Sequence, residues 1–123
     1  LLAALPKSVP SPKKTETANE NIQKAISYIE QNYFRELQQK EVAGLLYIHP
    51  QYLSRLFKKE LGVTFGEYLN RFRIEKAKEL LLQTNMPIYV VATECGFTDA
   101  AYFCKKFHQI MATTPLRYRK NAL

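Results

Sequence analysis

The chain has 123 residues, enough for one domain with one or two small apolar cores. Its 18 Lys and Arg outnumber 11 Asp and Glu, and the resulting charge of +7 favours an anionic partner. No apolar run is long enough to span a bilayer, and residues 1–5 are too short for a signal peptide, so no membrane partner is expected. Cys95 and Cys104 lack metal-ligand spacing to either histidine, which favours free thiols in a reducing cytosol, with no metal and no cofactor.

Residues 1–18 are rich in Pro, Lys, Ser and Thr, and this composition predicts a flexible linker. Since the chain does not begin with Met, we expect the linker to follow a missing N-terminal domain. Helical periodicity begins near Asn19 and predicts a first helix with one apolar stripe. The stripe consists of Ile22, Ile26, Ile29 and Tyr33.

A second helix is predicted over residues 38–46 and a third over residues 50–61, joined by a turn. Pro50 suits the first position of the third helix, because proline lacks the N–H group that is unbonded there anyway. Gly62 can take the left-handed conformation that ends a helix. The inward positions are Val42, Ala43 and Leu46, then Leu53, Leu56, Phe57 and Leu61.

A long fourth helix is predicted from a cap at Thr64 to about Gln83, with a length of about 30 Å. Its apolar positions are Phe65, Tyr68, Leu69, Phe72, Ala77, Leu80 and Leu81. Helices follow over residues 88–95 and from the cap Asp99 to about residue 111, and a last short helix runs from Thr114 through Lys120. The fold class is therefore all-α, with a first helix-turn-helix region at 19–63, a connecting helix at 64–84 and a second region at 85–123.

The sequence repeats itself after about fifty positions. Residues 52–58 return as residues 102–108, and the pair Val42-Ala43 returns as Val91-Ala92. Two copies are too few for a solenoid. Two copies of a helix, a turn and a basic helix instead indicate a paired reader of double-stranded DNA. The connecting helix is close in length to one turn of B-DNA, about 34 Å, so we expect the two copies to enter successive major grooves.

In each copy the second helix has an outward face at the spacing i, i+3, i+4, i+7. In the first copy this face consists of Gln51, Ser54, Arg55 and Lys58, and in the second copy of Ala101, Cys104, Lys105 and His108, with Ala100 beside them. Gln, Arg and Lys side chains reach base edges or phosphates, whereas alanine contacts a thymine methyl group and donates no hydrogen bond. We therefore expect an asymmetric site, with the first copy discriminating sequence more sharply.

The sequence resembles the C-terminal DNA-binding domain of the AraC/XylS family of bacterial transcription regulators, over roughly residues 19–119. The matching segments are Val42-Ala43, residues 52–62, Glu67-Tyr68-Leu69, Arg73, Ala77, Leu80-Leu81, Val91-Ala92, residues 96–99, Tyr102-Phe103, Phe107 and residues 114–119. The resemblance implies seven helices, a cytoplasmic, nucleoid-associated protein, binding to double-stranded promoter DNA, and activation through RNA polymerase. The missing N-terminal domain would be a ligand-sensing barrel or a phosphorylated receiver, and the sequence does not choose between them.

By position in the family, the residues divide into base-reading and phosphate-binding candidates. The base-reading candidates are Gln51, Ser54, Arg55, Ala100, Ala101, Cys104 and Lys105. The phosphate candidates are Lys58, Lys59, Lys106 and His108, together with the amides that open the helices near Leu37 and Ile88.

Four residues depart from the family pattern. His49 stands where a Ser cap is usual, which weakens the start of the third helix or makes it pH-sensitive. Ala101 replaces a common Ser, and Lys105 replaces a common Arg that would bind guanine through two hydrogen bonds. Ala112 stands where Gly usually ends the helix, so a left-handed cap would cost about 1 kcal/mol or the helix would end differently.

Other interpretations of the sequence remain open. A helical docking module for RNA polymerase or another protein would explain the weakly polar second face. Cys104 beside two lysines could serve as a redox sensor. The aromatic residues could stack on single-stranded bases, although their helical spacing favours the core, and the same spacing places Cys95 inward. An enzyme would need a carboxylate pair, a metal cluster or a nucleophile with its base, and we find no such pattern. The aromatic residues considered for base stacking, and expected in the core instead, are Phe57, Phe65, Tyr68, Phe72, Tyr102, Phe103 and Phe107.

Overall fold

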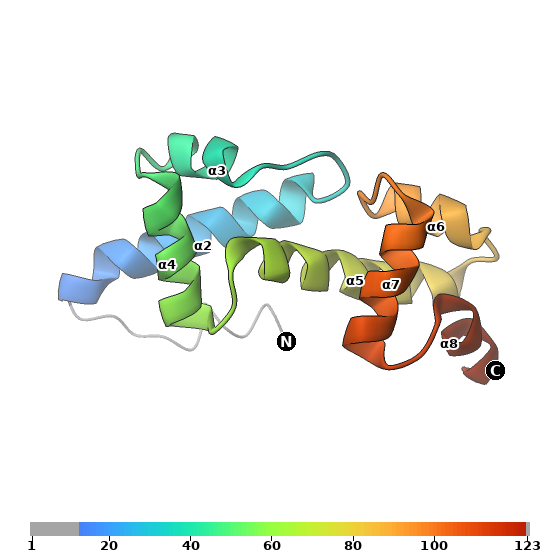
Figure 1. Ribbon diagram of the computed structural model, residues 1–123. Coiled ribbons are helices and arrows are strands. Elements are labelled where there is room, and N and C mark those ends of the chain that lie inside the picture. The colour runs from blue at the N-terminus through green and yellow to red at the C-terminus, as the bar shows by residue number, and fades with distance from the viewer. Residues whose placement is uncertain (1–12, 123) are drawn as a thin grey trace. The chain divides into compact units, whose positions relative to one another are not determined.

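The computed structural model describes residues 13–122, and these residues form seven helices and no strand (Figure 1). The helices are α2 (Lys13–Asn32), α3 (Gln39–Leu45), α4 (Pro50–Leu61), α5 (Phe65–Gln83), α6 (Ile88–Glu94), α7 (Ala100–Met111) and α8 (Pro115–Asn121). The all-α prediction is therefore confirmed. The contacts divide the chain into two compact units. The first unit contains the described residues up to Gln31 and Gln38–Phe65, and the second contains Asn32–Leu37 and the described residues from Gly66 onward.

The start of α2 differs from the sequence prediction. The helix begins at Lys13 rather than near Asn19, so residues 13–18 of the predicted linker are helical. No Pro or Gly occurs in this helix, and nothing in its backbone therefore opposes an earlier start. Residues 1–12, which carry the rest of the linker prediction, lie outside the described residues. At its other end the helix stops at Asn32. Tyr33, which was predicted to belong to the apolar stripe, follows the helix and is half-buried.

The first unit is held together by the apolar stripes of α2, α3 and α4. The buried residues are Ile22, Ala25, Ile26, Ile29, Val42, Ala43, Leu53, Leu56 and Phe57. The ring of Phe57 meets that of Phe65 edge to face, with centroids 5.5 Å apart. Across the unit, the Tyr28 hydroxyl donates to Glu41 Oε2 at 2.6 Å and so ties α2 to α3. The predicted stripes of these three helices are confirmed with three exceptions: Tyr33 lies beyond the end of α2, and Tyr33, Leu46 and Leu61 are only half-buried.

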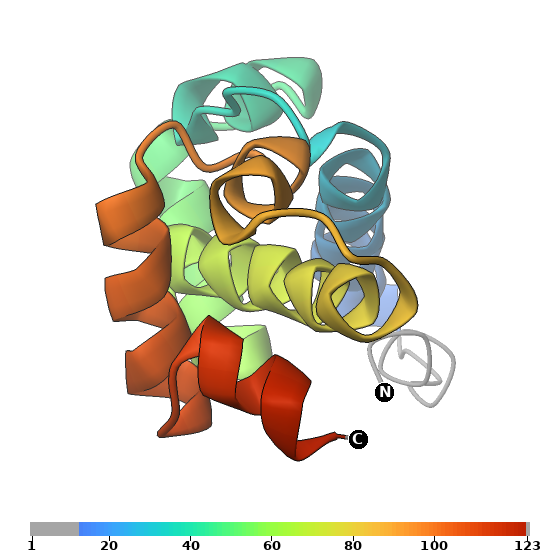
Figure 2. The same ribbon diagram turned by 90° about the vertical axis from the view of Figure 1, so that its right-hand side faces the viewer.

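The second unit is built around the C-terminal part of α5. In both ribbon views α6 and α8 lie on opposite sides of this part of α5, and α7 packs against both α6 and α8 (Figure 2). The core consists of Ile74, Ala77, Leu81, Val91, Ala92, Cys95, Phe97, Phe103 and Phe107. The Phe107 ring stacks edge-on with Phe103 at 5.8 Å and with Tyr118 at 5.6 Å. Ile74 is fully buried in this core, although its place there was not predicted from the sequence.

One aromatic residue assigned to the core is at the surface instead. The Tyr102 side chain is 43% exposed, whereas its neighbour Phe103 is fully buried. Successive helical residues point about 100° apart, so a residue next to the inward stripe falls at its edge. There the Tyr102 hydroxyl lies 3.3 Å from Asn70 Nδ2 of α5, which donates to it. The other six aromatic residues assigned to the core are buried.

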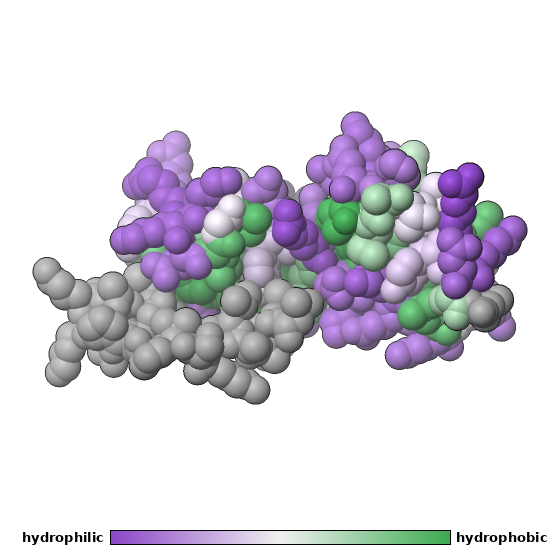
Figure 3. Space-filling view, turned by 90° about the horizontal axis from the view of Figure 1, so that it is seen from below, coloured by the Kyte–Doolittle hydropathy of each residue, from purple (hydrophilic) through white to green (hydrophobic). Residues whose placement is uncertain are grey.

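Hydrophilic residues cover most of the described surface seen in Figure 3, with small apolar patches between them. The largest exposed apolar side chains of the second unit include Leu82, Tyr89, Ile110 and Leu116. They come from four different helices, and single exposed apolar side chains of this kind are normal for a folded protein.

Candidate nucleic-acid interface

Both units contain a helix-turn-helix with the same backbone hydrogen bonds in the turn. Between α3 and α4, the Ile48 N–H donates to the Ala43 carbonyl at 3.0 Å, and the Tyr47 N–H donates to the Gly44 carbonyl at 3.2 Å. Between α6 and α7 the same two bonds recur 49 positions later, at 2.9 and 3.0 Å. These bonds join Phe97 to Ala92 and Gly96 to Thr93. The sequence repeat is therefore a repeat of backbone structure.

Each turn also passes through one residue with left-handed backbone. The residue is Tyr47 in the first unit, with φ of 58°, and Gly96 in the second, with φ of 96°. Tyr47 is 95% exposed, so its ring packs against nothing in the first unit. A side chain at Gly96 would overlap the carbonyl oxygen of Tyr33, which approaches the glycine closely. Only glycine therefore fits the turn of the second unit.

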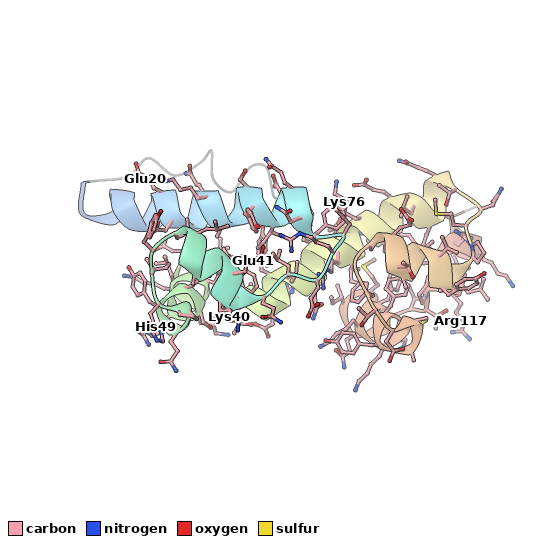
Figure 4. All side chains as sticks on the ribbon, turned by 90° about the horizontal axis from the view of Figure 1, so that it is seen from above. Glu20, Lys40, Glu41, His49, Lys76 and Arg117 are labelled. Atoms are coloured by element: carbon pink, nitrogen blue, oxygen red, sulfur yellow. The ribbon has the colours of Figure 1, made fainter. Side chains whose placement is uncertain are left out.

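The second helix of each motif begins with a side-chain cap. The His49 Nδ1 atom accepts a hydrogen bond from the Gln51 N–H at 3.1 Å, at the start of α4 (Figure 4). At the start of α7, Asp99 Oδ1 accepts from the N–H groups of Ala101 at 2.8 Å and Tyr102 at 3.4 Å. His49 thus performs the capping that is usual for Ser or Asp, with a ring nitrogen as the acceptor.

The two helices also end alike. Gly62 follows α4 with φ of 80°, and Ala112 follows α7 with φ of 60°. The expected bounds of α4 and α7 are confirmed, and Ala112 does take the left-handed conformation that alanine disfavours. α3 and α6 begin at Gln39 and Ile88, and neither helix has a side-chain cap from the residue that precedes it.

The outward face of α4 is polar and open to solvent. Gln51, Arg55 and Lys58 are exposed, and Ser54 is half-buried. Lys59, beside this face, is exposed too. Within the part of the chain whose side chains are described, no carboxylate pairs with Arg55. Its five N–H donors are therefore available to an external acceptor such as a guanine edge.

The outward face of α7 is smaller and less polar. Ala101, Lys105 and His108 are exposed, whereas Ala100 and Cys104 are half-buried and pack against the core of the second unit. Lys106 is also half-buried, and its Nζ lies 5.6 Å from the centre of the Tyr102 ring. Burial raises the pKa of the Cys104 thiol, so the reactive thiolate needed by a redox sensor is disfavoured.

The second unit contains an interaction that was not predicted from the sequence, the Arg73 clamp, in which one guanidinium group binds two main-chain carbonyl groups. Arg73 of α5 donates from Nε to the Tyr33 carbonyl at 2.8 Å and from a terminal nitrogen to the Arg35 carbonyl at 2.9 Å. Its guanidinium carbon lies 5.8 Å from the centre of the Phe97 ring. Burial lowers the pKa of Arg73. The only signal in the sequence was its place among the residues that match the family.

Arg119 makes a second bond of this type within the same unit. Its Nε donates to the Leu81 carbonyl near the C-terminus of α5 at 3.0 Å. Helix ends leave carbonyl groups without helical partners, and basic side chains commonly satisfy them. Arg119 therefore holds α8 against α5.

Two classes of site find no support among the described residues. Between residues 13 and 122 no helix is long and apolar enough to cross a bilayer. The side chains described in that range contain no group of three or more His, Cys, Asp or Glu residues able to hold a metal ion. Cys95 is fully buried, as predicted, and both cysteines are free thiols.

Comparisons with known proteins agree with this geometry. A sequence model of the helix-turn-helix domain family matches residues 42–121. The chain is 42% identical over 93 residues to the HTH-type transcriptional regulator YijO of Escherichia coli K12. The matched segment covers 76% of this chain and 33% of YijO. The C-terminal domain of AraT, a response regulator from Geobacillus stearothermophilus, has a TM-score of 0.79 at 37% identity, covering 82% of this chain and 84% of that chain.

A further solved structure is the DNA-binding domain of AdpA in complex with a target DNA. Its TM-score is 0.78 at 19% identity, covering 82% of this chain and 91% of that chain, and this likeness shows the fold alone. The fold is thus that of a paired helix-turn-helix domain. The chain belongs to the AraC-type helix-turn-helix family, which confirms the resemblance seen in the sequence. It spans about a third of the length of three curated relatives, YijO among them.

Proposed function

We propose that this chain binds double-stranded DNA sequence-specifically, with α4 and α7 as recognition helices in the major groove. The observation that carries the proposal is the outward face of α4. There Gln51 and Arg55 are exposed on a helix whose two ends are fixed, by the His49 cap and by Gly62. Gln pairs with adenine and Arg with guanine through two hydrogen bonds each. The charge of +7 supports binding to a polyanion.

The two recognition helices would occupy successive major grooves. The helix α5, which follows the first motif, has 19 residues and is therefore about 28 Å long, comparable with the repeat of about 34 Å in B-DNA. Lys58, Lys59, Lys106 and His108 would contact phosphates and position the helices without reading sequence. As part of a longer bacterial regulator, the chain would bind promoter DNA and activate transcription through RNA polymerase.

The test is selection of the chain on random duplex DNA, followed by binding of the selected duplex over a range of salt concentrations. We expect an asymmetric site with two short blocks and a slope of log affinity against log salt set by five to eight phosphate contacts, at about −0.9 per contact. Arg55→Ala should cost about 1–3 kcal/mol on the selected duplex and much less on an unrelated one.

Lys59→Ala is the matched control, since it removes one positive charge from an exposed position of the same helix. It should weaken binding to both duplexes equally and reduce the salt slope by about 1. Equal losses on both duplexes for Arg55→Ala would show that Arg55 reads no base. Enrichment of no sequence would contradict specific DNA binding altogether.

A further inference from the structure

The recognition face of α7 differs chemically from that of α4, although the two helices hold equivalent places in the repeat. Ala101 stands where α4 has Gln51, and Cys104 stands where α4 has Ser54. No amide or hydroxyl group is therefore available at these two positions of α7. The exposed methyl group of Ala101 is flanked by the half-buried Ala100 and Cys104, and Lys105 supplies the one charged group.

The structure holds this apolar surface rigidly. The Asp99 carboxylate accepts from the Ala101 and Tyr102 N–H groups, so Ala101 lies on a fixed first turn of the helix. Cys104 packs against the second unit's core, whose large members Phe103 and Phe107 are fully buried. Because burial raises the pKa of the Cys104 thiol, the group is neutral at ordinary pH and is at most a weak hydrogen-bond donor. The face thus has a defined shape and little polarity.

We propose that α7 reads thymine through its C5-methyl group, so that the second half-site is recognised by apolar contact rather than by hydrogen bonds. This inference rests on the proposed function, DNA binding. Thymine alone among the four bases projects a methyl group into the major groove, and alanine is one of the side chains that contact it. α4, with Gln51 and Arg55, suits adenine and guanine instead. The chain therefore reads its two half-sites by two different chemistries.

Deoxyuridine provides the test, because it lacks only the methyl group of thymine and keeps every hydrogen-bonding group of the base. The selected duplex is used, and the block whose preference is relaxed by Arg55→Ala is assigned to α4. Replacing a contacted thymine of the other block by deoxyuridine should weaken binding about fourfold, the factor that corresponds to burying one methyl group. The same replacement in the α4 block should change the affinity less than twofold.

Two variants connect the effect to α7. Ala101→Gly removes the methyl group on the protein side and should make binding insensitive to deoxyuridine at the thymine that Ala101 contacts. Lys105→Ala, one turn further along the same exposed face, should weaken binding to all duplexes but keep the fourfold effect of deoxyuridine. Circular dichroism of both variants checks that α7 remains folded, since glycine is a poor helix former.

The possible results separate the two proposals. Selective binding with no deoxyuridine effect in the second block would overturn methyl readout and leave DNA recognition intact, with α7 holding only the backbone. A deoxyuridine effect that persists unchanged in Ala101→Gly would overturn the assignment to this face. Failure to select any sequence would overturn the proposed function itself, and the reading of thymine with it.

Discussion

Ala112 is the residue at which the structure predicts a gain in stability from a single substitution. It ends α7 with left-handed backbone, at φ of 60°. Gly62, 50 positions earlier, ends α4 in the same way, at φ of 80°. A residue with a Cβ atom pays roughly 1–2 kcal/mol in this conformation, because the Cβ atom crowds the following carbonyl oxygen. Ala112→Gly removes this cost.

Two opposing terms set the size of the effect. Glycine has more freedom in the unfolded chain, which offsets about 0.4–1 kcal/mol of the gain. The Ala112 side chain is exposed, so little packing is lost when it is removed. Ala112→Gly should therefore raise the free energy of unfolding by about 0.5–1 kcal/mol. For a domain of this size, that corresponds to a rise in Tm of about 2–6 °C.

Urea and thermal unfolding, followed by circular dichroism, measure the change. The matched control is Gly62→Ala, where an added Cβ atom would meet no other atom within 4 Å, so only the backbone cost remains. It should lower the free energy of unfolding by a similar amount. Gly44→Ala, also in open space but within the helix α3, should instead raise it by up to about 1 kcal/mol. A loss of stability in Ala112→Gly would refute the reasoning.

Three further substitutions test other parts of the structure. Gly96→Ala should lower the free energy of unfolding by more than about 2 kcal/mol, measured by urea unfolding, because the new Cβ atom overlaps the Tyr33 carbonyl at a positive φ. His49→Ala should lower the free energy of unfolding by about 1 kcal/mol through loss of the cap on α4, and His49→Ser should keep the original stability because Ser also caps a helix. Equal free energies of unfolding for His49→Ala and His49→Ser would show that the cap contributes nothing. Burial raises the pKa of the Cys95 thiol from 9.0 to about 12, so the thiol loses its proton at a lower pH in the unfolded chain than in the folded one. The contribution of Cys95 to the free energy of unfolding is therefore complete below pH 9 and is lost as the pH rises toward 12. Between pH 7.5 and 9.5 the free energy of unfolding should fall by about 1 kcal/mol, and the Cys95→Ala variant should lack this fall.

The bounds of α4 and α7 could be predicted because local chemistry marks their ends. Pro50 and Gly62 delimit α4, and Asp99 caps α7, each by a mechanism that needs no distant partner. The start of α2 has no such marker. Several residues before Asn19 are compatible with a helix, and no local signal among them marks the residue at which the helix begins.

The Arg73 clamp could not be predicted from the sequence, because its partners are main-chain carbonyl groups about forty positions away. The acceptors are those of Tyr33 and Arg35, and any residue offers a carbonyl group. No periodicity or charge pattern distinguishes such an acceptor. A substitution at Arg73 would therefore affect a segment that sequence reasoning places in a different part of the chain.

The two left-handed turn residues show what a sequence repeat predicts and what it leaves open. Tyr47 and Gly96 hold the same backbone position, with the same hydrogen bonds on either side, so the repeat predicts the course of the chain at both. It does not predict their side chains, because these depend on what lies next to each turn. In the second unit the Tyr33 carbonyl, held by Arg73, leaves no room for a Cβ atom, whereas Tyr47 projects into solvent. The same reasoning applies to the recognition faces: the repeat fixes where Ala101 and Gln51 are presented, and only their own chemistry decides which bases they read.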